Sequence, residues 1–181
     1  MIQTQTRSKQ HFSAPNNLAT PPANSGSSIT KPALNVISIN IEGFSNIKGD
    51  LLANLCKDSN CDILCVQETH RDSYLPRPQI PGLLLIAEIP HAKHGSAVFV
   101  KPNVVVQSVI SRSDNSIETI TIDTGFCTIT SIYKPPSQPF QFNYTSNFHN
   151  QRIKLIIGDF NSHSPAWGYT SSNTDGDAVE Q

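Results

Sequence analysis

The chain has 181 residues, of which 37% are hydrophobic and 15% are charged, and this composition is typical of one globular domain with a core of its own. The formal net charge of −1 at pH 7 excludes a general basic coat for tight, non-specific binding to nucleic acid, although a few local cations suffice for weak, salt-sensitive binding. No apolar run approaches the roughly 20 residues needed to cross a bilayer, and the N-terminus lacks the apolar core of a signal peptide. We therefore expect a soluble protein with no membrane partner.

The first 32 residues differ in composition from the rest of the chain. They hold four prolines among Ser, Thr, Asn and Gln, and they show neither helical nor strand periodicity. Such a segment cannot bury enough apolar surface to offset the entropy lost on ordering. We expect residues 1–32 to form a disordered tail and residues 33–181 to form the folded domain.

The first half of the domain alternates strands with one helix. The β-branched run 34–39 predicts a buried strand that ends at Asn40, followed closely by Glu42. Apolar residues at helical spacing (Ile47, Leu51, Leu52 and Leu55) predict an amphipathic helix over 46–57. A second buried strand over 62–66 leads to Glu68. A proline-broken loop follows it.

The second half predicts antiparallel sheet. Apolar runs separated by turn residues indicate successive antiparallel strands over 83–88, 96–101, 104–110, 117–123 and 126–133. Residues 137–152 predict an irregular connection or a short helix. The last apolar run, 153–157, ends at Gly158, Asp159, Phe160 and Asn161. The pattern as a whole indicates an α/β chain with much antiparallel sheet.

Four of these strands end in polar side chains of complementary chemistry. Asn40, Glu68, Tyr133 and Asp159 each lie at or just beyond a strand end, and Asn161 is two residues after Asp159. Buried strands that stop at polar residues commonly line a cleft. We therefore expect the acids, amides and phenol to share one site.

In this order the polar motifs closely resemble the endonuclease/exonuclease/phosphatase superfamily, which has the DNase I-like fold. The motifs are Asn40-Ile41-Glu42-Gly43, Gln67-Glu68-Thr69, Tyr133 before its prolines, and Gly158-Asp159-Phe160-Asn161. Within the superfamily, the segments 94–100, 162–168 and 173–176 resemble the endonuclease domain of jockey-like non-LTR retrotransposons. The resemblance implies a four-layer sandwich of two mixed β-sheets with outer helices.

The resemblance also implies a chemistry and a role for each motif residue. It implies a Mg²⁺-dependent DNA endonuclease, with Mn²⁺ as an alternative ion, in which Glu68 is the main metal ligand and Asn40 lies beside it. Glu42 either assists the metal or has a supporting or surface role. Asp159 would orient or deprotonate the attacking water, and Asn161 would hydrogen-bond the phosphate. Tyr133 would donate to a non-bridging oxygen, the alternative being simple packing against Pro135 and Pro136.

In the intact retrotransposon, the resemblance implies that the nicked DNA primes a reverse transcriptase domain of the same polyprotein, with the nucleus as the site of action. In the family the domain continues past residue 181 to a Ser-Asp-His motif, so we expect a chain truncated at the C-terminus that nicks DNA inefficiently by itself. The alternatives are another phosphodiesterase or phosphatase of the superfamily and a catalytically inactive fragment.

Other chemically interesting residues have simpler interpretations. The cysteines lack the paired spacing of a zinc site, so we expect reduced, incidental thiols at Cys56, Cys61, Cys65 and Cys127. We expect His70, His94 and His163 to be loop residues rather than ligands or bases. Solvated surface charges are the expected state of the cations nearest the proposed site, which are Arg71, Arg77, Lys93, Lys101 and Lys134.

Overall fold

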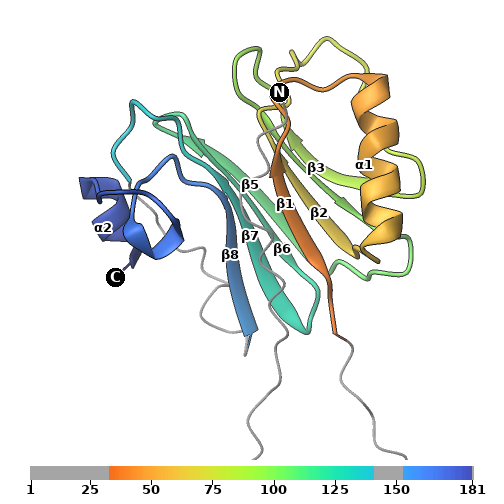
Figure 1. Cartoon of the computed structure of the whole chain (residues 1–181). Coiled ribbons are helices and arrows are strands. Elements are labelled where there is room, and N and C mark those ends of the chain that lie inside the picture. Colours follow the sequence, from red (N-terminus) through yellow and green to blue (C-terminus); the bar gives the residue numbers. More distant parts are fainter. Residues whose placement is uncertain (1–32, 141–152, 181) are drawn as a thin grey trace, which may run out of the picture.

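A computed structural model describes residues 33–140 and 153–180, which form two four-stranded sheets packed face to face (Figure 1). The first sheet contains β1 (Val36–Asn40), β2 (Ile63–Gln67), β3 (Leu84–Ile89) and β4 (Ser96–Val100). The second contains β5 (Ser108–Asp114), β6 (Ile117–Asp123), β7 (Cys127–Tyr133) and β8 (Ile153–Asp159). The predicted sandwich of two mixed sheets is confirmed.

The two sheets have the same pattern of pairing. Their strand orders are β1-β2-β4-β3 and β5-β6-β7-β8, and each sheet has one parallel pair, β1 with β2 and β7 with β8. The remaining pairs are antiparallel. In Figure 1 both parallel pairs run toward the same end of the sandwich. The carboxyl ends of β1, β2, β7 and β8 are therefore gathered at one end of the molecule.

Two apolar layers hold the sandwich together. On β2, Ile63 and Cys65 face the second sheet, while Leu64 and Val66 face the opposite side. A strand covered on both faces needs a continuous apolar run, which is why every residue of β2 and β4 is buried. The inner layer joins the two sheets through residues such as Val98 and Ile122.

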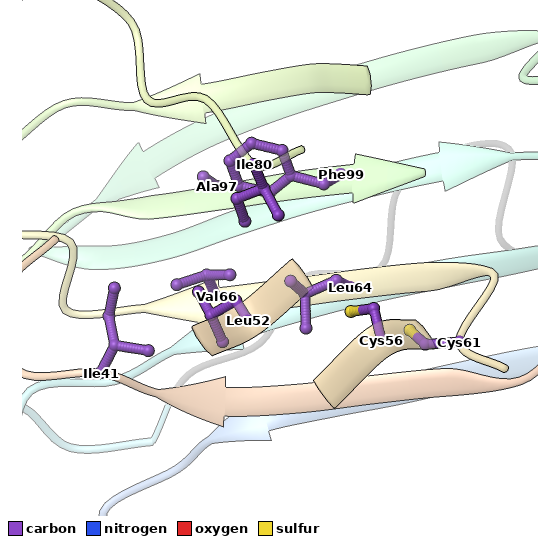
Figure 2. Close-up of a cluster of buried hydrophobic side chains, with 9 residues drawn as sticks. All are labelled: Ile41, Leu52, Cys56, Cys61, Leu64, Val66, Ile80, Ala97 and Phe99. Atoms are coloured by element: carbon purple, nitrogen blue, oxygen red, sulfur yellow. The ribbon is translucent and has the colours of Figure 1, made fainter. Parts of the chain in front are cut away.

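The outer layer packs the first sheet against α1 (Asn46–Asp58), as Figure 2 shows. Ser45 caps the helix, since its side chain accepts a hydrogen bond from the Lys48 N–H at 3.2 Å. The predicted helix is confirmed, but part of its predicted apolar face is wrong. Leu52 is buried together with Cys56, whereas Ile47 is 75% exposed and Leu51 is 51% exposed. Both lie beyond the narrow stripe that meets β2, because a helix on a flat sheet buries less than half its circumference.

The other predicted elements have mixed outcomes. The strand predicted over 117–123 matches β6, and all four cysteines are free and buried. The strand predicted over 104–110 is found four residues later, as β5. β5 also does not pair with the preceding strand β4, because the chain crosses to the other sheet there. Residues 1–32, and 141–152 of the predicted connection, lie outside the described residues.

Beyond β8 the chain forms a short 3-10 helix, η2 (Pro165–Trp167), and a second α-helix, α2 (Thr174–Glu180). In Figure 1 both lie beside the end of β8. Neither α1 nor α2 is long and apolar enough to cross a membrane.

Candidate active site

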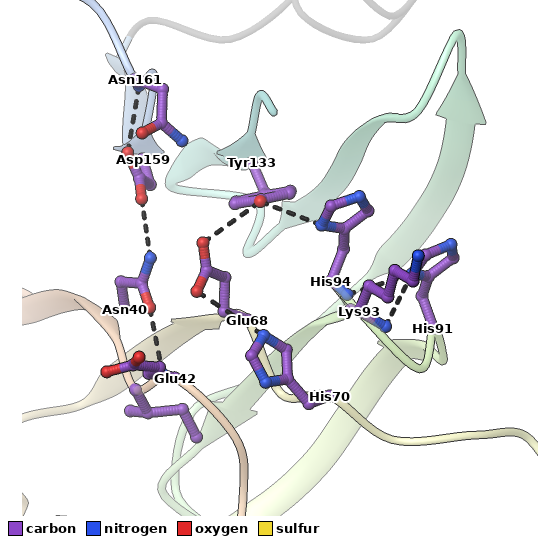
Figure 3. A network of polar contacts seen from close by, with 12 residues as sticks. Asn40, Glu42, Glu68, His70, His91, Lys93, His94, Tyr133, Asp159 and Asn161 are labelled. Atoms are coloured by element: carbon purple, nitrogen blue, oxygen red, sulfur yellow. Dashed lines mark hydrogen bonds and ion pairs between the residues drawn. The ribbon is translucent and has the colours of Figure 1, made fainter. Parts of the chain in front are cut away.

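The carboxyl ends of β1 and β8 meet through a side-chain pair. Nδ2 of Asn40 donates a hydrogen bond of 2.8 Å to Oδ2 of Asp159 (Figure 3). The Oδ1 atom of the same amide accepts from the Glu42 N–H at 3.1 Å. Asn40 is therefore held at both ends of its amide, with its nitrogen turned toward Asp159.

The loop after β8 is fastened to the end of β7. Asp159 is 5% exposed, and its Oδ1 accepts from the backbone N–H of Asn161 at 3.0 Å. The side chain of Asn161 donates to the Lys134 carbonyl at 2.9 Å, and the Lys134 N–H donates to the Asp159 carbonyl at 2.8 Å. These bonds fix Asp159 and Asn161 beside Tyr133, the last residue of β7.

Glu68 and Tyr133 form the second half of the site. The Tyr133 hydroxyl donates to Oε1 of Glu68 at 3.2 Å and lies 3.0 Å from Nδ1 of His94. Nε2 of His70 lies 3.6 Å from the other carboxylate oxygen of Glu68. Burial, followed by the negative charge of Glu68, raises the pKa of Tyr133 well above its ordinary value, so the phenol keeps its hydrogen at neutral pH.

Four residues around this site have left-handed backbone conformations although they are not glycine. Their φ angles are 48° at Glu42, 53° at Glu68, 49° at His70 and 44° at Asn161. Such conformations cost energy and persist where surrounding contacts determine them, which is common at active sites. At Glu68 the conformation ends the ladder of β2 and turns the chain toward the site.

The donor set fits a hard divalent cation bound through few protein ligands. The Glu68 side chain is 22% exposed, and within residues 33–140 and 153–180 its Oε2 has only the long contact with His70. Mg²⁺ keeps several of its waters and needs one or two carboxylates, so Glu68 with the Asn40 amide oxygen is a sufficient set. Among the described residues no group of three or more His, Cys, Asp and Glu side chains could hold a metal. In Figure 3 the Glu42 carboxylate lies apart from that of Glu68, and only the Glu42 backbone contacts Asn40.

The expectation that the nearby cations are all solvated holds for Arg77 and Lys93 and is wrong for Lys134. It is also wrong for Arg71, whose side chain is 13% exposed and whose Nε lies 3.6 Å from Oε1 of Glu88. Lys134 is fully buried, and its Nζ lies 2.8 Å from Oδ2 of Asp175 and donates to the Gln138 carbonyl at 2.8 Å. Its position directly after Tyr133, at the buried end of β7, takes the side chain inward toward α2. Arg77 and Lys93 are exposed.

Two histidines and one glutamate belong to the site although sequence reasoning missed them. His70 and His94 are in loops, as expected, but both contact site residues. Glu118 is 2% exposed and accepts from the Gly95 N–H at 3.0 Å and from the Ser96 hydroxyl at 2.6 Å. The available signal was a carboxylate within a strand of alternating isoleucine and threonine, because an acid is rarely buried without bonded partners.

His163 lies apart from this network, as predicted. It is exposed, and its ring stacks on Tyr169 with ring centroids 4.2 Å apart. Trp167 donates through Nε1 to the Ser162 carbonyl at 3.0 Å. These contacts shape the loop that follows Asn161.

Residues 37–178 match the model of the Endonuclease/Exonuclease/phosphatase family. No curated protein matches the sequence. The solved structures that resemble the chain include TDP2 from Caenorhabditis elegans, with 15% identity and a TM-score of 0.36 over 66% of this chain and 38% of that one. The chain therefore spans well under half the length of that protein.

Proposed function

We propose that the chain, which belongs to the endonuclease/exonuclease/phosphatase family, is a hydrolase that cleaves phosphodiester bonds in DNA. The observation that carries the proposal is the meeting of four strand ends, which places the Asn40–Asp159 pair beside the Glu68–Tyr133 pair. One pair combines an amide with an acid, and the other combines a phenol with an acid. Phosphodiester hydrolysis needs such an arrangement, because water must be activated while charge on the phosphate is stabilised.

Each side chain has a role that its contacts support. Glu68 and Asn40 would hold Mg²⁺, or Mn²⁺ in its place, and a bound ion would neutralise charge that develops on the phosphate. Asp159 receives hydrogen bonds at both carboxylate oxygens, which fix its orientation for accepting a proton from the attacking water. Tyr133 would donate its O–H to a phosphate oxygen, and Asn161 would donate the amide N–H that is not bonded to the Lys134 carbonyl.

The finer assignment follows from the resemblance of the segments 94–100, 162–168 and 173–176 to the retrotransposon endonucleases. On this proposal the chain nicks one strand of nuclear DNA, and a reverse transcriptase domain of the parent polyprotein extends the new 3′ end. With a net charge of −1, binding would depend on local cations and weaken steeply with salt.

A plasmid-relaxation assay with the whole chain tests this function. We expect slow conversion of supercoiled to nicked DNA that requires Mg²⁺ and disappears in Asp159→Asn. Asp114→Asn, which changes an exposed acid at the end of β5, is the matched control and should nick like the unchanged chain. Nicking that is equal in Asp159→Asn, or absent with every divalent ion, would overturn the proposal.

A further inference from the structure

We propose that His94 is a positioning residue for Tyr133, whose phenol oxygen it holds by donating a hydrogen bond from Nδ1. The inference rests on the proposed function in one respect: it takes an oxygen of a phosphodiester substrate as the group that accepts the Tyr133 hydrogen bond. The hydrogen bond itself follows from the metal-free geometry.

The direction of the bond follows from counting hydrogens. The Tyr133 hydroxyl lies 3.2 Å from Oε1 of Glu68 and 3.0 Å from Nδ1 of His94. A phenol has one hydrogen to donate, and in the contact with Glu68 the phenol is the donor and the carboxylate oxygen is the acceptor. The hydrogen between Tyr133 and Glu68 must therefore come from Tyr133, which leaves Nδ1 of His94 as the donor in the second contact.

The surroundings of His94 hold its ring in this orientation. Nδ1 of His91 accepts from the backbone N–H groups of Lys93 and His94 at 3.1 and 3.0 Å, and the rings of His91 and His94 stack with centroids 4.6 Å apart. The His70 N–H donates to the His94 carbonyl at 2.7 Å. The turn that carries His94 is thus tied to the end of β2 as well as closed on itself.

A buried carboxylate ties the same turn to the second sheet. Glu118 accepts from Gly95 and Ser96, the two residues that follow His94, and it pairs directly with Tyr133 in the register of β6 and β7. The strand that bears Tyr133 and the turn that bears His94 are therefore held together through Glu118.

The arrangement gives Tyr133 a defined task. Because His94 already donates to the phenol oxygen, it cannot accept the phenol hydrogen. That hydrogen is directed to Glu68 in the free protein, and it would become available to a substrate oxygen if Glu68 held a cation. Removing the His94 donor lets the hydroxyl rotate, so it reaches a substrate oxygen less often.

Nitrogen NMR of the histidine side chains tests the bond without any activity. In ¹⁵N-labelled, metal-free protein well above the ordinary imidazole pKa, His94 should show the Nδ1–H tautomer. Its signals are identified by their loss in His94→Phe, and they should shift in Tyr133→Phe. His163→Phe is the matched control, since His163 also stacks on a tyrosine, and it should leave them in place. The Nε2–H tautomer at His94 would overturn the proposal.

Nicking rates test whether His94 acts through Tyr133. An Asn amide nitrogen occupies nearly the position of Nδ1 and a Gln amide nitrogen that of Nε2, so His94→Asn should keep most of the rate while His94→Gln and His94→Phe lose about tenfold. In a Tyr133→Phe background, His94→Phe should cost nothing more. A full tenfold loss in that background would overturn the proposal. If the unchanged chain fails to nick, the proposed function fails and the tautomer alone decides the role of His94.

Discussion

Asn40 and Asp159 are 119 residues apart in the chain, yet the amide of one donates to the carboxylate of the other at 2.8 Å. The pair joins the edge strand of one sheet to the edge strand of the other, β1 to β8. This hydrogen bond is one of those that link the two sheets at the point where the chemistry is proposed, together with the bond from Tyr133 to Glu68. Asp159 is oriented from the opposite sheet, so its position depends on the packing of the whole sandwich.

Asn40→Ala should reduce the nicking rate about 10²-fold, which is the usual cost of removing one preorganised donor, with little change in melting temperature because Asn40 is only half-buried. Asn40→Asp should be at least as harmful. Two carboxylates at this distance cannot both be ionised easily, so the pair would share a proton and Asp159 would be a poorer base. Initial rates of plasmid nicking measure both effects. Asn54→Ala, an exposed residue of α1, is the control, and an equal loss there would point to a general defect.

Glu68→Gln should abolish metal-dependent nicking and weaken Mn²⁺ binding, because the neutral amide loses the charge that attracts the ion. Glu42→Gln should lose less, since the exposed Glu42 side chain lies apart from Glu68. Titration of Mn²⁺ followed by electron paramagnetic resonance measures binding separately from catalysis. Equal losses of binding in the two variants would make Glu42 an equal ligand.

Gly158→Ala should destabilise the fold strongly. The φ angle of Gly158 is 154°, and a Cβ atom there would overlap the backbone carbonyl of Ile132 on the neighbouring strand. Because backbone cannot move aside cheaply, we expect a loss of about 3 kcal/mol or more in the free energy of unfolding. Gly168→Ala also has a positive φ, 95°, but nothing lies within 4 Å, so it should cost only about 1–2 kcal/mol. Urea unfolding compares the two, and similar losses would contradict the steric argument.

The sequence predicted the site residues best at the ends of strands. It predicted least well which side chains pair when the partners are far apart in the chain. Asn40, Glu68, Tyr133 and Asp159 could be placed together because each follows an apolar run. The burial of Lys134 could not be predicted, since its partner Asp175 lies on a helix far along the chain. His94 was passed over because its phenol partner, Tyr133, lies on another sheet.

The predictions for α1 and β5 were also wrong where the outcome depends on contacts between distant parts of the chain. Helical spacing placed α1 correctly but could not tell which of its apolar residues meet the sheet, so Ile47 was assigned to the wrong face. The apolar run 104–110 suggested a strand four residues too early, because the residues that cross between sheets are apolar as well. The catalytic and metal-binding roles of the site residues stay predictions.

Asp175→Asn should destabilise the protein near neutral pH and not in acid. Lys134 is fully buried, and its Nζ lies 2.8 Å from Oδ2 of Asp175, so removing the carboxylate leaves a buried charge with only carbonyl partners. Breaking such a pair costs about 3 kcal/mol. The hydrogen bond from Lys134, with that from the Phe140 N–H, lowers the pKa of Asp175 below its ordinary value of 3.8.

The lowered pKa of Asp175 determines how the free energy of unfolding changes with pH. The folded state binds the proton of Asp175 less readily than the unfolded state, so the stabilisation is complete above the ordinary aspartate pKa and is lost as the pH falls through the lower, folded value. Urea midpoints for the unchanged chain and Asp175→Asn should therefore differ at neutral pH and converge in acid. Asp177→Asn, an exposed acid on the same helix, should differ little from the unchanged chain throughout. If the difference in urea midpoint between the unchanged chain and Asp175→Asn stays constant from neutral pH into acid, the Asp175 charge does not stabilise the buried Lys134.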